Sequence, residues 1–247
     1  STYGLPAGSY YLETNLTLDG GITVYGEVTL CLNGNSIIGE TDYAVISVGP
    51  HTIFTLTDCE GTGTITHGEK GDGSKYSGSG VSVAYGTFNM EGGSITGNNA
   101  GLSGGGGVWL HSGEFNMSGG SITDNTATSY GGGVFVGDGT FTVSGGVKIS
   151  GNKKSDGSDS NVYLSGGKTI TVTGALDGAE IGVTTATAPV AGSPITIAEG
   201  GDGYGMPGSD AAVFFADDLG KYSTKFAEDV VQLCSGATLV KHPVCGK

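Results

Sequence analysis

The sequence of 247 residues predicts an all-β fold, a parallel β-helix solenoid with three short strands in each turn of about 26–28 residues. Three observations lead to this prediction. A block of nearly the same sequence occurs three times at almost equal steps, starting at Gly86, Gly113 and Gly139. Apolar and polar residues alternate inside each block, which is the period of a β-strand. Glycine supplies 50 residues, and pairs of glycines separate the strand-like segments.

Each turn contains three strand-like segments, and equivalent segments carry like residues. The apolar positions are Val81/Val83, Val108/Leu110, Val134/Val136 and Val162/Leu164 in the first segment, Phe88/Met90, Phe115/Met117 and Phe141/Val143 in the second, and Ile95, Ile122 and Ile149 in the third. Because neighbouring parallel strands lie about 4.8 Å apart, equivalent residues of successive turns stack on one another. Burying each large side chain contributes about 1.5–3 kcal/mol, so we expect these columns to form the core.

Polar residues also recur once per turn. Asn98, Asn125 and Asn152 follow the isoleucine segment at equal intervals. We expect a structural ladder in which each asparagine amide bonds the next along the axis, and we favour it over a ligand-binding role. The glycine pairs fit corners that need a positive φ, where a Cβ is strained.

The repeats fade towards both ends of the chain. We expect a single domain over residues 1–247, with about seven turns, the regular ones covering residues 22–183. Alanine and proline replace the alternating pattern after that, so residues 184–240 are interpreted as irregular final turns or a cap. A cap is needed because an open terminal turn exposes a strand edge.

The charge of the chain excludes one class of partner. The net charge is −14, and all ten cationic side chains are lysines, so arginine is absent. Such a surface does not neutralise a run of phosphates, so no nucleic-acid partner is expected. No apolar run in the sequence approaches the length that a membrane-spanning helix needs, so no membrane insertion is expected either.

Four cysteines offer two candidate disulfides. Cys31 and Cys59 are about one turn apart, so a bridge between adjacent turns is compatible with the Cα spacing that disulfides need. The alternative is a pair of buried free thiols. Cys234 and Cys245 are candidates to close a small terminal loop. Four cysteines allow three pairings, and the sequence does not choose among them. We expect no metal site from these cysteines, because zinc-ligand spacing is lacking.

The repeat cores resemble those of a known class of surface protein. The pattern NMxGGxIxxNxA, the GGGVxV strands, VTLCLNG near the start and NVYLSGGKTITVTGAL after the repeats are similar to right-handed β-helix repeat regions of large surface proteins of anaerobic Gram-positive bacteria. The resemblance implies a right-handed, pectin-lyase-like β-helix, secreted or attached to the cell wall. HPVCGK resembles the start of a short Cys/His-rich module, which implies a monomeric unit within a longer multidomain chain.

No catalytic constellation emerges from the sequence. A lyase of the pectate type needs a basic residue beside carboxylates, but Lys148 has serines at the equivalent positions. A hydrolase needs two carboxylates about 5–9 Å apart, but Glu114 has threonines one turn either side. Asp217 and Asp218 are interpreted as a solvated turn, and the four histidines as scattered and unpaired. We therefore expect no catalytic residues, no cofactor and no resident metal, although calcium in the acidic loops stays open.

An aromatic column is the candidate binding surface. Strand alternation turns Val108 and Leu110 inward and Trp109 outward, and the equivalent residues of the next turns are Phe135 and Tyr163. Flat rings about 5 Å apart suit the faces of a polysaccharide. Two alternatives stay open: the column is covered by the C-terminal segment around residues 213–215, or it stabilises the sheet through cross-strand pairs.

These expectations favour a non-catalytic module of a secreted or cell-surface protein. The module would act as an adhesin, a glycan-binding unit or a spacer, with a polysaccharide or a host or bacterial surface glycan as its partner. The alternative is a carbohydrate-active enzyme, either a polysaccharide lyase or a glycoside hydrolase, built on the same fold.

Overall fold

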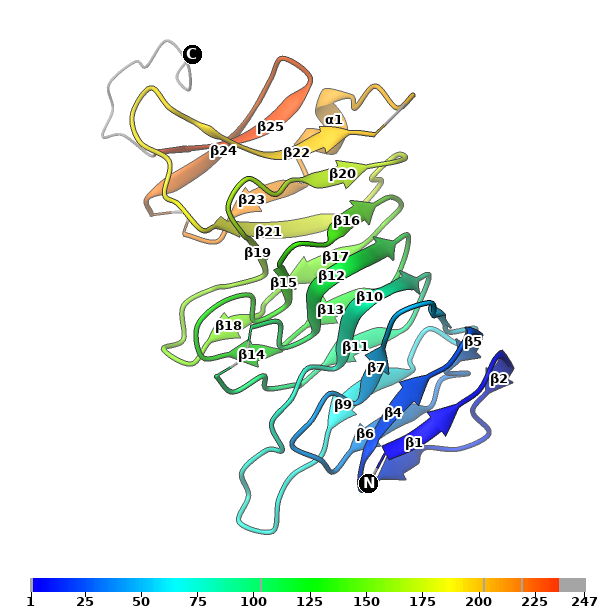
Figure 1. The fold of residues 1–247 in the computed structure, drawn as a ribbon. Helices are drawn as coiled ribbons and strands as arrows, with labels where there is room; N and C mark the ends of the chain where they lie inside the picture. The colour runs from blue at the N-terminus through cyan, green and yellow to red at the C-terminus, as the bar shows by residue number, and fades with distance from the viewer. Residues whose placement is uncertain (1, 103, 202, 219, 236–247) are drawn as a thin grey trace.

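The computed structural model describes residues 2–102, 104–201, 203–218 and 220–235. Across these residues the chain is almost entirely β-structure, and its strands succeed one another along the length of the molecule (Figure 1). One sheet of 23 strands and a second sheet of two strands, β14 (Thr126–Ala127) and β18 (Lys153–Lys154), contain all the strands of this part of the chain. The single short helix within it is α1 (Gly208–Ala211). None of the described residues forms an apolar helix of membrane-spanning length.

Stack A is the first of three stacks of hydrogen-bonded strands. Val81 of one pass of the chain pairs with Val108 of the next, and Val108 pairs with Val134, always in parallel. The members of stack A are β1 (Thr2–Leu5), β4 (Gly21–Val24), β7 (Ile46–Val48), the first halves of β10 (Val81–Met90) and β12 (Val108–Met117), β15 (Val134–Val136), β19 (Val162–Leu164) and β21 (Glu180–Thr185).

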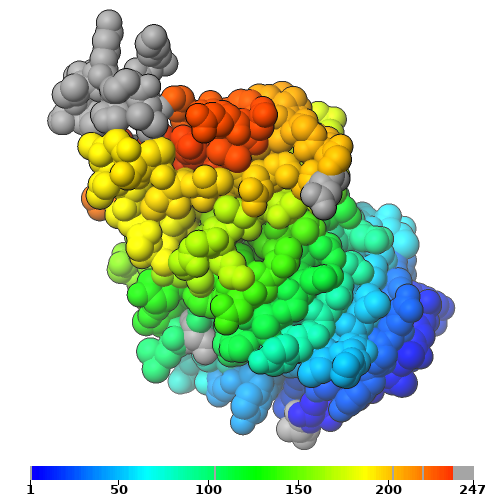
Figure 2. Space-filling view, turned by 45° about the horizontal axis from the view of Figure 1, so that its top comes forward, coloured from blue at the N-terminus to red at the C-terminus, as the bar shows by residue number. Residues whose placement is uncertain are grey.

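Stacks B and C complete each pass of the chain. Stack B contains β2 (Gly8–Tyr11), β5 (Glu27–Cys31), β8 (Ile53–Thr57), the second halves of β10 and β12, β16 (Thr140–Val143), β20 (Ile170–Val172) and β22 (Ile195–Gly200). Stack C contains β3 (Leu16–Leu18), β6 (Ser36–Gly39), β9 (Thr64–His67), β11 (Ser94–Thr96), β13 (Ser121–Thr123), β17 (Lys148–Ser150) and the start of β21. Figure 2 shows the same succession at the surface, where bands of colour follow one another from the N-terminal to the C-terminal end.

The core consists of columns of like residues between the stacks. Phe54, Phe88, Phe115 and Phe141 are fully buried, and their rings stack with centroid separations of 5.5, 5.0 and 4.8 Å. The isoleucines of stack C are buried in the same way, as register partners in successive strands. Parallel pairing at one-pass intervals therefore turns the repeat of the sequence into continuous apolar columns.

One corner glycine shows why the repeats require this residue. Gly120 has a φ of 82°, and a Cβ built on it would lie 2.5 Å from the carbonyl oxygen of Gly93, its counterpart in the preceding pass. Any side chain there would be strained in φ and would push apart two backbones that pack directly on each other. The glycine pairs thus permit the close stacking of the corners.

The pairing changes near the C-terminal end. β22 continues stack B in parallel, but its other edge pairs antiparallel with β25 (Val230–Ser235), which pairs antiparallel with β24 (Tyr222–Ala227). The edge of β22 is therefore occupied by a strand of opposite direction, which does not leave it open for pairing with another chain. β23 (Phe214–Ala216) pairs in parallel with β21. Cys245 and the predicted module at residues 241–247 lie outside the described residues.

Candidate functional site

The three predicted binding residues lie in one column on the outer face of stack A. Trp109 is the register partner of Phe135, and Phe135 is the partner of Tyr163. All three side chains are half-buried, whereas their strand neighbours Val108 and Leu110 are fully buried. The rings of Phe135 and Tyr163 stack with centroids 5.6 Å apart and an interplanar angle of 9°. The backbone thus presents the three rings outward at successive strands.

Packing covers the three rings unequally. Tyr130, from the loop before β15, lies against Tyr163 with ring centroids 4.5 Å apart. A Cβ on Gly104, in the loop before β12, would lie 2.7 Å from the ring of Phe135, so the backbone of this second loop packs directly on that ring. The ring of Trp109 contacts that of the exposed His111 edge-on, with the ring centroids 5.7 Å apart and an interplanar angle of 83°. Within the described residues, Trp109 therefore has no stacked ring partner, in contrast to Phe135 and Tyr163.

The alternative in which residues 213–215 cover the column is wrong. This segment belongs largely to β23, which pairs with Ile181–Val183 and so adds a strand to the sheet. Phe214 is buried in the core as the register partner of Ile181. The segment pairs beside β21 in the sheet, and Phe214 continues the buried column of isoleucines there.

Small hydroxyl residues continue the column beyond Trp109. The outward register partner of Trp109 in the preceding strand is Ser82, followed by Ser47 and then Thr23. Because these side chains are short, a cleft of about 520 Å³ opens beside the indole ring. Its lining residues are Asp42, Tyr43, Ala44, Ser47, Ser77, Gly78, Ser79, Ser82, Ala100, Leu102 and Trp109. The sequence contains no signal for this cleft, because its rim comes from loops of unequal length that follow no repeat.

The asparagines form a second column of side chains, which follows the strands of stack C and is buried inside the molecule. Asn98, Asn125 and Asn152 are at most 1% exposed. Nδ2 of Asn98 donates to Oδ1 of Asn125 at 2.9 Å, and Nδ2 of Asn125 donates to Oδ1 of Asn152 at 3.0 Å. The backbone N–H groups of Asn98 and Asn125 also donate to the amide oxygen of the next asparagine, each at 3.0 Å. These backbone donors fix the direction of the amides, so the ladder has one polarity.

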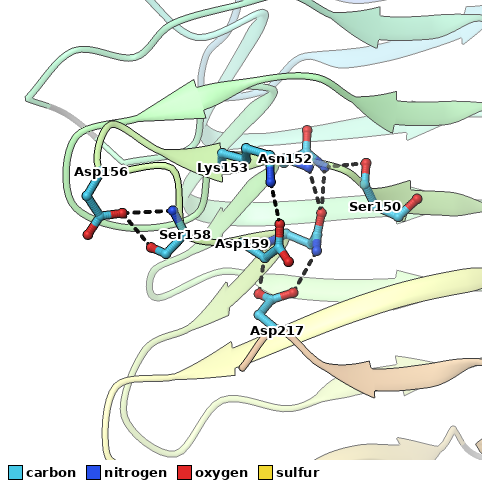
Figure 3. Close-up of polar contacts among 8 residues, drawn as sticks. Ser150, Asn152, Lys153, Asp156, Ser158, Asp159 and Asp217 are labelled. Carbon is cyan, nitrogen blue, oxygen red and sulfur yellow. Dashed lines mark hydrogen bonds and ion pairs between the residues drawn. The ribbon is translucent and has the colours of Figure 1, made fainter. Parts of the chain in front are cut away.

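A carboxylate terminates the ladder at its donor end. Nδ2 of Asn152 donates to Asn161 at 3.0 Å, and Nδ2 of Asn161 donates to Asp217 at 2.6 Å (Figure 3). Asp217 also accepts hydrogen bonds from the backbone N–H of Asn161 at 2.8 Å and from the hydroxyl of Thr184 at 2.7 Å. Burial raises the pKa of this carboxyl, and the three donors oppose that change. The interpretation of Asp217 as a solvated turn residue is therefore wrong; it lies 56 residues from Asn161 in sequence, so no local pattern reveals the contact.

A histidine terminates the ladder at its acceptor end. Nδ1 of His67 lies 2.8 Å from Oδ1 of Asn98, and Nε2 lies 2.9 Å from the carbonyl oxygen of Tyr43. Nδ2 of Asn98 donates to the carbonyl oxygens of Ile65 and Thr96, so the amide oxygen is the atom that faces the ring. Both neighbours of the ring are acceptors, and a neutral imidazole donates to only one of them. Burial nevertheless lowers the pKa of His67, while the two contacts and Asp42 raise it and Lys75 lowers it. The interpretation of His67 as an unpaired histidine is therefore wrong.

The residues considered for catalysis lie apart. Glu114 is exposed and its register partners are Thr87 and Thr140; the Thr87 hydroxyl lies 3.5 Å from it. Lys148 is exposed and forms an ion pair with Glu180 at 3.4 Å. Within the described ranges, no group of three His, Cys, Asp or Glu side chains is arranged to hold a metal ion.

The structure describes both members of the predicted Cys31–Cys59 pair but only Cys234 of the predicted Cys234–Cys245 pair. Cys31 is the last residue of β5 and Cys59 lies in the turn after β8; both are free cysteines, and their Sγ atoms lie 2.8 Å apart. Burial raises the pKa of the Cys31 thiol, but hydrogen bonds, first of all with Cys59, outweigh it and lower this pKa; the same contact raises the pKa of Cys59. Cys234 is buried in β25, and Cys245 lies outside the described residues. Cys234 is disulfide-bonded, whereas a Cys31–Cys59 disulfide and the identity of the partner of Cys234 stay predictions.

No known protein family, curated protein or solved structure matches the chain.

Proposed function

We propose that the chain is a right-handed parallel β-helix. Three stacks of parallel strands, each pairing equivalent residues of successive passes, support this arrangement. The registers follow the repeat of the sequence, with Phe88 on Phe115 and Ile95 on Ile122. The connection from each pass to the next in the same direction is what a solenoid requires.

We propose that this solenoid is a non-catalytic, glycan-binding module of a secreted or cell-surface protein, acting as an adhesin. The observation that carries the proposal is the outward column of Trp109, Phe135 and Tyr163 in strand register. Rings held at the strand spacing offer flat apolar faces to pyranose rings, and the neighbouring hydroxyl of Ser82 suits a sugar hydroxyl group. The resemblance of the repeat cores to those of Gram-positive surface proteins supports an extracellular location.

Glycan titration tests the proposal directly. Trp109 is the only tryptophan of the chain, so its fluorescence reports binding at the column. We expect plant, mucin or bacterial polysaccharides to shift its emission, and we expect Trp109→Ala and Tyr163→Ala to weaken binding at least tenfold by calorimetry. Tyr11→Ala is the matched control, because Tyr11 is an exposed tyrosine of β2 that lies outside the column.

Two outcomes would overturn the proposal. The absence of binding by every polysaccharide of the panel, at millimolar sugar, would exclude the glycan role. New reducing ends or unsaturated products after incubation would instead favour the alternative of a carbohydrate-active enzyme.

A further inference from the structure

The floor of the cleft beside Trp109 consists of serine side chains, whereas the rest of the column consists of aromatic rings. Ser47 and Ser82 point outward from β7 and β10 as register partners, between strand neighbours that are fully buried. The indole of Trp109 forms one wall, and the loops at residues 42–44 and 77–79 form the rim. The cleft volume of about 520 Å³ lies within the range of about 300–1,000 Å³ that is usual for small-molecule sites.

Three hydroxyl groups of this cleft have no hydrogen-bond partner among the described residues. Ser79 is only 4% exposed and lines the cleft, and its hydroxyl neither donates to nor accepts from another described side chain or backbone group. The same holds for the hydroxyls of Ser47 and Ser82, although the two residues are adjacent in register. Among the described residues the only buried side-chain oxygen or nitrogen without a partner is Oε1 of Gln232, so the Ser79 hydroxyl is open to the cleft. The three hydroxyls are therefore available to water or to a ligand in the cleft.

Serines at comparable positions in stack C behave differently. Ser121 donates to Ser94 at 3.0 Å, and Thr64 donates to Ser36 at 2.8 Å, each between register partners of adjacent strands. Pairing is not a rule of this fold, however, because the hydroxyls of Thr123 and of its register partners Thr96 and Ser150 do not bond one another. The cleft is distinguished instead by the indole of Trp109 and by the volume that the short side chains leave beside it.

The charges around the cleft select an uncharged ligand. Asp42 is the one carboxylate among the lining residues, and it is already bound to Lys70 at 2.8 Å and to the backbone N–H of Ser77 at 2.9 Å. No lysine lines the cleft, and the chain has no arginine and a net charge of −14. An anionic sugar would enter this site without a cation to compensate its charge.

We propose that this cleft is a subsite for a single uncharged hexopyranose unit, stacked on the open face of Trp109 and hydrogen-bonded to Ser47, Ser79 and Ser82. This inference rests on the proposed glycan-binding function and assigns it a ligand class and a position. The apolar face of the sugar meets the indole, and its hydroxyls satisfy the three serine hydroxyls that the protein leaves unpaired. Phe135 and Tyr163, on the other side of the indole, then contact only the remainder of a longer chain.

Methyl hexopyranosides and the methyl glycoside of galacturonic acid are the probes that test this assignment. We expect the neutral methyl glucoside, galactoside or mannoside to shift Trp109 emission, and the uronate to bind at least tenfold more weakly. Equal or tighter binding of the uronate would overturn the inference. Failure of all monosaccharides to bind, with an oligosaccharide still bound, would also overturn it.

Substitutions of the serines that line the cleft distinguish a failure of this inference from a failure of the proposed function. We expect Ser82→Val and Ser79→Ala each to weaken binding of the neutral glycoside at least tenfold. Thr23→Val is the matched control, since Thr23 continues the same column two strands before Ser82 but does not line the cleft. If Ser82→Val and Ser79→Ala bind an oligosaccharide normally while Trp109→Ala and Tyr163→Ala do not, the glycan-binding function stands and the subsite is wrong. If no sugar binds the parent protein, the proposed function itself fails.

Discussion

The residues of the asparagine ladder and of the aromatic column repeat with the same period, but the ladder is buried inside the molecule and the aromatic column lies on its outer face. Asn98, Asn125 and Asn152 lie inside, almost fully buried, and each amide is hydrogen-bonded to its neighbour in the ladder. Trp109, Phe135 and Tyr163 lie outside, half-buried and unequally covered. The same repeat of the sequence produces a column in both cases. The side chains of the inner column are satisfied by other protein groups, whereas those of the outer column remain partly accessible from outside.

The two columns also end differently. The ladder ends in His67 and Asp217, which meet its acceptor and donor ends respectively. The aromatic column ends at Trp109 in a cleft with unpaired hydroxyls. A buried polar column must be satisfied at both ends because an unpaired polar group in the interior costs about 1–3 kcal/mol, whereas water satisfies an outer one. The following predictions test this contrast, from the largest expected effect to the smallest.

Ile122→Asn should give the largest loss of stability. Ile122 is fully buried between register partners, and an amide there has no partner, so we expect the free energy of unfolding to fall by about 4 kcal/mol or more. Urea denaturation measures the effect. Ile122→Val is the control, with an expected loss of about 0.5–1.5 kcal/mol. Equal stability of the two variants would mean that the isoleucine column is not the core.

Asn125→Ala should cost less, about 3 kcal/mol, because it leaves buried ladder partners without hydrogen bonds on both sides. Asn116→Ala is the matched control on the outer face. Asn116 bonds Asn89 at 3.0 Å and Thr142 at 2.7 Å, but it is half-buried, so we expect a loss under about 1 kcal/mol. The same denaturation experiment compares them, and equal losses would contradict the distinction between inner and outer columns.

His67 should make the stability of the fold depend on pH. Because burial lowers its pKa in the folded state, its contribution to stability is present above the ordinary histidine value of about 6.5 and is lost as pH falls through the lowered folded value. We expect the free energy of unfolding to decrease between pH 7.5 and pH 5 and to decrease less in His67→Gln. The exposed His111 provides the control: His111→Gln should retain the pH dependence of the parent. An unchanged slope in His67→Gln would show that other groups cause it.

Single truncations of the aromatic column should have the smallest effect on stability. We expect Trp109→Ala to lower the free energy of unfolding by under about 1 kcal/mol, because the ring is half-buried and meets His111 only edgewise. Phe135→Ala should lose more than Trp109→Ala, since Phe135 packs on Gly104 and stacks on Tyr163. Thermal unfolding ranks the two. A larger loss for Trp109→Ala would indicate that the column serves the fold rather than a ligand.

The sequence by itself determined the columns. Residues repeated once per turn fall on one another when the chain returns in parallel, so the stacking of Phe88 on Phe115 and the register of Trp109 with Phe135 follow from spacing alone. Strand alternation likewise determined which of these residues face inward. Both are local, periodic properties, and a periodic signal is present in the sequence whatever the surrounding structure.

Only the tertiary structure decided how the columns end. Asp217 reaches Asn161 across 56 residues and His67 reaches Tyr43 across 24, and neither residue belongs to the repeat. The cleft likewise needs the loops at residues 42–44, 77–79 and 100–102 to meet beside Trp109. Such contacts have no period, because they depend on loop lengths and on where the regular strands stop. The hydrogen bonds of the half-buried Asp217 and the opening beside Trp109 are therefore properties of the assembled fold.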